Sequence, residues 1–158
     1  MTSFKHILVP TDFGEAADCA IDTAVILAAK FDARVTLLHA SGIPPYAYSA
    51  YAEGLYWPTN EMTKEDKRCL DALVEKTKER YASVDGVVLA GEPWLAILEV
   101  SKSRHADLIV MGTHGRRGLS RVFLGSVAEK IVRLSPIPVL TVSGVADRAA
   151  KETALATK

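Results

Sequence analysis

The segment Asp107-Leu-Ile-Val-Met-Gly-Thr-His-Gly-Arg-Arg-Gly-Leu-Ser-Arg-Val-Phe-Leu-Gly-Ser126 leads from an apolar run through a glycine-rich stretch into a predicted helix. Residues 107–111 have the pattern of a short buried strand, and a helical pattern covers residues 126–134. Four glycines between these elements let the backbone turn sharply and approach a ligand, while N–H groups at the helix start can point at phosphate oxygens. The same pattern also suits a tight connection without a ligand, and the residues alone leave both interpretations open.

Strand and helix patterns alternate along the rest of the chain. We predict strands at residues 5–10, 34–40, 86–91, 107–111 and 138–142, and helices at 16–28, 62–81, from 93 through 100, and 126–134. Thr63 and Asp66 have the spacing of a capping box at the start of the second helix. The alternation predicts the α/β class, as a single doubly wound domain with a parallel sheet and helices on both faces.

Length and composition limit the possible functions. A chain of 158 residues suits one domain, and we predict it at 1–143, followed by a flexible tail at 144–158. Because Lys plus Arg and Asp plus Glu each total 19, no net charge attracts nucleic acid or a membrane, and we expect neither partner. The first ten residues lack a secretory or membrane-spanning pattern, so we expect a cytoplasmic protein. Cys19 and Cys69 lack the spacing of a metal site and indicate no disulfide.

Residues 41–60 are predicted to form a long loop that is rich in aromatic residues and interrupted by prolines and a glycine. The rings either cover exposed core or a subunit contact, or they form a lid or a partner surface. The sequence leaves these alternatives open.

The spacing of the glycines distinguishes among nucleotide-binding motifs. Neither the Gly-x4-Gly-Lys-Ser/Thr phosphate loop nor the Gly-x-Gly-x-x-Gly dinucleotide pattern is present. The pattern Gly112-x2-Gly115-x9-Gly125-Ser126 resembles the nucleotide-binding motif of the universal stress protein family. Residues 7–12, 106–116 and 138–142 also resemble the first, fourth and last strands of that family, so the resemblance extends over about residues 5–142.

This resemblance implies a five-stranded parallel sheet in the order 3-2-1-4-5, which places the first and fourth strands side by side. It further implies that Asp12 binds the ribose hydroxyls, and that Thr11 and Ala40 border the adenine. Gly112 would lie near the sugar, and a larger aliphatic residue is common in the family where this chain has Ala40. The resemblance also places Pro10 and Met111 in the binding site, next to Thr11 and Gly112. At the phosphates it implies contacts from Gly115, Gly125, Ser126 and Val127. His114 and Arg116 would lie close to the phosphate charge.

Several of these residues also have structural interpretations. Asp12 precedes a helix and could be its N-cap, and Ser126 has capping-box spacing with Glu129. His39 is expected to be held by local hydrogen bonds, and His6 and His105 are assigned to structure or solvent. Arg116, together with Arg117 and Arg121, either contacts the anion or forms a solvated loop surface.

The resemblance suggests an ATP-binding regulator that responds to nucleotide in a stress response, with ADP or AMP as alternative ligands and Mg²⁺ accompanying the phosphates. A slow ATPase that uses the same cleft, with His114 stabilising charge, is the alternative, and no catalytic residue is assigned. We also expect a homodimer through the fifth strand, because Val139, Leu140 and Val142 lie on a sheet edge, and a regulatory protein partner is possible.

Overall fold

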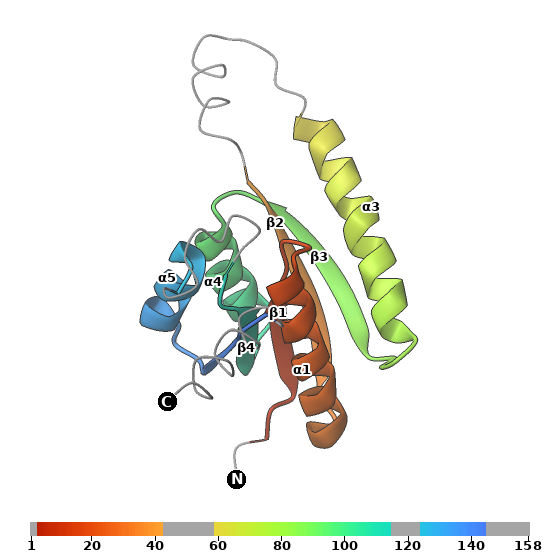
Figure 1. The fold of residues 1–158 in the computed structure, drawn as a ribbon, viewed down its shortest axis with the longest axis vertical. Helices are drawn as coiled ribbons and strands as arrows, with labels where there is room; N and C mark the ends of the chain where they lie inside the picture. The colour runs from red at the N-terminus through yellow and green to blue at the C-terminus, as the bar shows by residue number, and fades with distance from the viewer. Residues whose placement is uncertain (1–2, 43–58, 115–123, 145–158) are drawn as a thin grey trace, which may run out of the picture.

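The computed structural model describes residues 3–42, 59–114 and 124–144. The strands and helices follow one another as β1 (His6–Pro10), α1 (Glu15–Phe31), β2 (Arg34–Ser41), α3 (Thr59–Lys78), β3 (Val84–Ala90), α4 (Pro93–Ser103), β4 (Leu108–Gly112), α5 (Ser126–Leu134) and β5 (Val139–Val142). All pairings are parallel, and the sheet order is β3-β2-β1-β4-β5 (Figure 1). The predicted α/β fold and strand order are confirmed.

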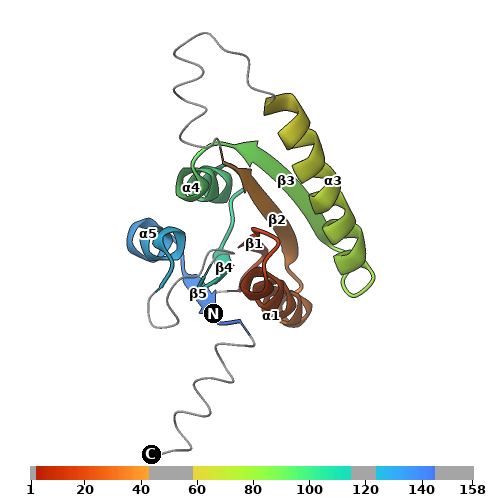
Figure 2. The ribbon, with the colours of Figure 1, turned by 45° about the horizontal axis from the view of Figure 1, so that its top comes forward.

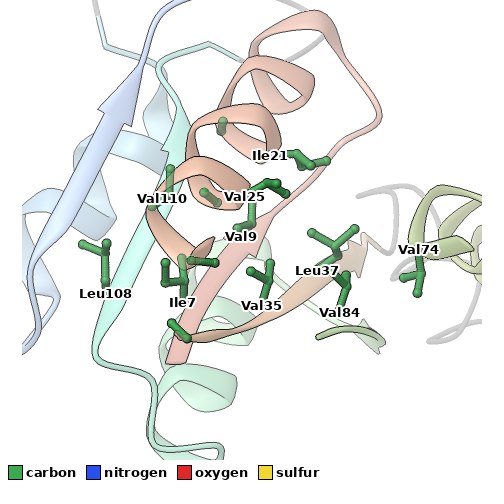
Figure 3. Close-up of a cluster of buried hydrophobic side chains, with 14 of the residues drawn as sticks. Ile7, Val9, Ile21, Val25, Val35, Leu37, Val74, Val84, Leu108 and Val110 are labelled. Carbon is green, nitrogen blue, oxygen red and sulfur yellow. The ribbon is translucent and has the colours of Figure 1, made fainter. Parts of the chain in front are cut away.

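The sheet separates two apolar cores because side chains alternate between its faces. Ile7 and Val9 of β1 belong to the core beneath α1 and α3, whereas Leu8 between them belongs to the core beneath α4 and α5. Figure 2 shows these two pairs of helices on opposite sides of the sheet, and Figure 3 shows the first core. All three side chains are 0% exposed, as expected for a central parallel strand.

Helix α1 approaches the sheet closely because its buried face consists largely of small residues. Ala20, Ala24 and Ala28 are 0% exposed. At the start of the helix, a Cβ added to Gly112 would lie 2.9 Å from both the backbone carbonyl carbon and the Cβ of Ala16. Glycine at the end of β4 is therefore a packing requirement, which fixes the start of α1 against this strand.

Two element starts differ from the prediction by more than one residue. β3 begins at Val84, which pairs with Val35, and Gly86 lies inside the strand, where α3 packs closely over it. α3 begins at Thr59, directly after the last proline of the loop, so the predicted loop 41–60 is helical at its end and β2 includes Ser41. Thr63 thus lies within α3, and the predicted capping box with Asp66 is wrong. The rest of this loop, from 43 to 58, lies outside the described residues.

Two smaller predictions concern the cysteines and the tail. Cys19 is buried in α1 and Cys69 is exposed on α3, and both are free thiols. The tail lies outside the described residues from residue 145 onward. No helix in the described part of the chain is long and apolar enough to cross a membrane.

Polar contacts tie the strands together at their amino ends. The buried His6 ring donates from Nδ1 to the Arg104 carbonyl at 2.9 Å, and its Nε2 lies 2.8 Å from the Thr36 hydroxyl. That hydroxyl donates to Asp85, whose other oxygen pairs with Arg104. Desolvation lowers the pKa of His6 below its usual 6.5, Arg34 and Arg104 lower it further, and the Arg104 carbonyl and Asp85 oppose the shift.

This lowered pKa predicts that the fold loses stability in mild acid. Below pH 6.5 the unfolded chain binds a proton on His6 more readily than the folded chain does, so the free energy of unfolding decreases as the pH falls. Thermal unfolding of the parent and of His6→Gln between about pH 7 and about pH 5 tests this, since a histidine of ordinary pKa, as in the unfolded chain, gains its proton in this range. The melting temperature of the parent should fall more steeply than that of the variant, and equal slopes would contradict the prediction.

The contact between Gly112 and α1 gives a second prediction. Gly112→Ala forces the backbone of α1 away from β4, and overpacking of this kind should lower the free energy of unfolding by about 1 to 3 kcal/mol. The matched control is Gly42→Ala at the end of β2, where an added Cβ meets nothing within 4 Å. Chemical denaturation of both variants should show a clear loss for the first and little change for the second. If both behave alike, the close approach is not a constraint.

Candidate functional site

The carboxyl ends of β1 and β4 lie side by side, which brings the two predicted halves of the site together. Ile7 pairs with Leu108 and Leu8 with Ile109, so the two strands are parallel. They end at Pro10 and at Gly112, on the same edge of the sheet. Thr113, just beyond β4, donates its N–H to the Val142 carbonyl at 2.9 Å. This edge is where the sheet order reverses, and ligands bind open α/β sheets at such points.

The turn between β1 and α1 holds Asp12 in a defined conformation. The Thr11 N–H donates to the Leu38 carbonyl at 2.8 Å, and the Phe13 N–H donates to the Thr11 hydroxyl at 3.0 Å. The Asp12 carboxylate accepts from the Gly14 N–H at 3.0 Å. The N-cap of α1 is Gly14, and no side chain caps it, so the N-cap interpretation of Asp12 is wrong. Asp12 instead closes a tight turn at the sheet edge.

The start of α5 is connected to the end of β4 by one hydrogen bond. The Gly125 N–H donates to the Thr113 carbonyl at 2.7 Å, and Gly125 is the N-cap of α5 with φ −60° and ψ 153°. No side chain caps this helix, and Glu129 pairs with Arg133 in the next turn, so the predicted capping box with Ser126 does not form. Ser126 is exposed at the first helical position.

The first turn of α5 has backbone N–H groups that can bind an anion. The N–H of Glu129 is the first to bond within the helix, to the Gly125 carbonyl at 2.8 Å. The N–H groups of Ser126, Val127 and Ala128 precede that bond and therefore have no acceptor within the helix. Together with the helix dipole, such N–H groups favour a bound anion.

The remaining predicted residues divide into described and undescribed ones. Ala40 lies near the end of β2, where it pairs with Leu89 of β3 and is partly exposed. His114 follows β4, with its Nδ1 2.9 Å from the Thr113 hydroxyl. Gly115 and Arg116 lie outside the described residues, as do Arg117 and Arg121.

A group of polar residues that the sequence assigned to other roles lies beside the Asp12 turn. His39 of β2 donates from Nδ1 to the Thr11 carbonyl at 2.9 Å. This side chain is thus held by a hydrogen bond, as the sequence analysis expects. Its Nε2 lies 3.6 Å from Asp66 of α3, which also accepts a short hydrogen bond from the Ser41 hydroxyl. The contact between His39 and Asp66 joins distant segments of the chain, so no local sequence signal identifies it.

This arrangement can bind a ligand that is polar at one end and anionic at the other. The Asp12 carboxylate can accept hydrogen bonds from hydroxyl groups, and the first turn of α5 can donate to an anion. Among the described residues, no three His, Cys, Asp or Glu side chains are grouped so as to hold a metal ion.

Comparisons with known proteins agree with the fold and show the family. The model of the Universal stress protein family matches residues 3–143. Universal stress protein MJ0531 of Methanocaldococcus jannaschii is 35% identical over 140 residues, which cover 88% of this chain and 82% of that protein. The solved structure of hypothetical protein MJ0577, from the same organism, is 28% identical with a TM-score of 0.78, covering 90% of this chain and 97% of the other.

Two further solved structures have the same fold at lower identity. A universal stress protein in complex with cAMP has a TM-score of 0.62 at 23% identity, covering 90% of this chain and 99% of that one. The universal stress protein from Archaeoglobus fulgidus in complex with dAMP has a TM-score of 0.66 at 21% identity, covering 89% and 99%. With the family match extending over nearly all of the described chain, the protein belongs to the universal stress protein family.

Proposed function

We propose that this protein binds an adenine nucleotide, with ATP as the ligand and ADP or AMP as alternatives, and acts as a nucleotide-responsive regulator in a stress response. The observation that carries the proposal is the adjacency of β1 and β4, because it brings the Asp12 turn and the start of α5 to the same sheet edge. The complexes of related folds with cAMP and dAMP support an adenine nucleotide as the ligand class.

In this proposal the nucleotide extends along the edge from β2 to α5. Thr11 and Ala40 border the adenine, the Asp12 carboxylate accepts from the ribose hydroxyls, and Gly112 lies near the sugar. Pro10 and Met111, which directly precede Thr11 and Gly112 in the chain, complete this part of the proposed binding site. The phosphates lie at the first turn of α5, next to Gly125, Ser126 and Val127, with His114, Gly115 and Arg116 close by.

The uncapped start of α5 favours a phosphate over other anions. Three N–H groups without a helical acceptor match the several oxygens of a phosphate, and glycine at the N-cap leaves space for a close approach. Because no metal-binding group of side chains occurs in the described residues, any Mg²⁺ would be held mainly by the phosphates of the nucleotide.

We also propose that the protein is a homodimer through β5, which is an edge strand. Val139 and Val142 pack against the two cores of their own subunit, but Leu140 between them remains 38% exposed. The unpaired backbone groups of the edge and this leucine are the features that a second copy would cover.

The first functional prediction compares the two ends of the nucleotide. Gly125→Val places a branched side chain at the phosphate end, and the φ of −60° is one that valine adopts readily, so the variant should fold. Losing two charge-assisted hydrogen bonds weakens ATP binding by about two to four orders of magnitude. Asp12→Asn retains the oxygen that accepts from Gly14 and removes only the charge, so its loss should be smaller and equal for adenosine and ATP.

Calorimetry with adenosine and ATP measures both variants, and circular dichroism provides the control for folding. Gly125→Val should lower the affinity for adenosine much less than the affinity for ATP. If that variant binds ATP as tightly as the parent does, the phosphates are not bound at α5.

The dimer proposal predicts that Leu140→Lys yields monomers, because a charge on the edge strand opposes pairing with a second sheet. Light scattering should give twice the monomer mass for the parent and the monomer mass for the variant. Ile26→Lys is the matched control, since Ile26 is 59% exposed on α1, away from the sheet edge. A monomeric parent, or a dimeric Leu140→Lys, contradicts the proposal.

A further inference from the structure

The polar group beside the Asp12 turn consists of His39, Ser41 and Asp66, and we call it the His39 cluster. It joins β2 to α3 at the carboxyl end of the sheet. The side chains of His39 and Asp66 are 14% and 27% exposed, so the cluster is largely shielded from water. Polar contacts in such surroundings are stronger than the same contacts on an open surface.

The hydrogen positions in the cluster follow from its acceptors. The Thr11 carbonyl oxygen can only accept, so the Nδ1 of His39 carries a hydrogen and donates it across 2.9 Å. The opposite ring nitrogen then faces Asp66, 3.6 Å from its Oδ1, while the other oxygen of that carboxylate accepts from the Ser41 hydroxyl. The Ser41 hydroxyl therefore holds the carboxylate beside the ring, and the two side chains attract each other as an ion pair when both ring nitrogens carry a hydrogen.

The turn that His39 contacts is strained. Phe13, directly after Asp12, has φ 61°, in the left-handed region that is unfavourable for a residue with a side chain. Such a conformation persists only where neighbouring contacts hold it. One of these contacts is the His39 ring, whose centroid lies 4.5 Å from that of Phe13 with 33° between the planes.

The cluster lies on the opposite face of the sheet from the proposed phosphate site. Leu37, two residues before His39 on the same strand, belongs to the core beneath α1 and α3. α5 covers the other face, together with α4. His39 thus reaches the site through the backbone of the Asp12 turn rather than from the side of the nucleotide phosphates.

From these contacts we infer that His39, oriented by Asp66, is a positioning residue for the nucleotide site: it holds the Thr11 carbonyl and the Phe13 ring so that Asp12 is presented to the ribose. The inference rests on the proposed function. It gives α3 a part in binding, because the supporting carboxylate comes from that helix. Movement of α3 would change the Asp12 turn without any contact between α3 and the nucleotide.

The first test replaces the ring. His39→Ala removes the hydrogen bond and the ring contact, and it should weaken adenosine and ATP binding alike, by about three- to tenfold. His39→Asn retains a donor near the position of Nδ1, and its affinity should return to within about twofold of the parent. Equal losses in both variants, or no loss in His39→Ala, would overturn the inference.

A double-mutant cycle shows whether His39 acts through Asp12. If it does, His39→Ala should weaken binding little further, by less than about twofold, once Asp12→Asn is present. Two losses that multiply in the double variant would contradict the inference, because they indicate independent contacts. If the parent binds no adenine nucleotide, the proposed function itself fails, whereas a binding parent with an unaffected His39→Ala refutes only the positioning role.

The second test examines the support from α3. Asp66→Ala should weaken adenosine binding by about two- to fivefold, since the ring loses its charged neighbour. Asp71→Ala on the same helix is the control, because the Asp71 side chain is 59% exposed and pairs with the exposed Lys67 one turn before it. If the two variants bind adenosine equally well, Asp66 has no part in positioning.

Discussion

The pairing of β1 with β4 is the constraint on which the rest of the structure depends. Ile7, Leu8 and Val9 of β1 are apolar and fully buried, so this strand can lie only in the middle of the sheet with helices on either side. The chain winds outward from it in both directions, to β2 and β3 and to β4 and β5. The segments that follow β1 and β4 therefore leave the sheet next to each other, although α1, β2, α3, β3 and α4 lie between them in the chain.

The two edges of the sheet have different character. At the amino ends, His6, Thr36, Asp85 and Arg104 form a closed set of hydrogen bonds that joins β1, β2, β3 and the end of α4. At the carboxyl ends, the Asp12 turn is strained at Phe13 and the first turn of α5 lacks a side-chain cap. The N–H groups without a helical acceptor lie at the carboxyl edge, where a ligand can use them, while the hydrogen bonds at the amino edge supply stability.

The sequence predicts the strands well because their apolar runs are set by burial on both faces, and the family resemblance adds the strand order. The helix starts are also predicted to within one residue, except for α3, which begins at Thr59. Neither proposed capping box forms, because Thr63 lies inside α3 and Ser126 follows the N-cap Gly125. Their acidic residues have other partners: Asp66 accepts from Ser41 of β2, and Glu129 pairs with Arg133 one turn along. The His39 cluster is a tertiary contact, and no pattern along the chain encodes it. Gly115 and Arg116 lie outside the described residues, so their roles remain predictions.

The central claim is that one nucleotide spans the Asp12 turn and the start of α5. Backbone amide chemical shifts, recorded on isotopically labelled protein during a titration with AMP, test it residue by residue. We expect the largest changes at residues 11–14 and 125–128, and almost none at the amino-end contacts around His6. Changes confined to one of the two segments, or centred on the amino ends of the strands, would contradict the account.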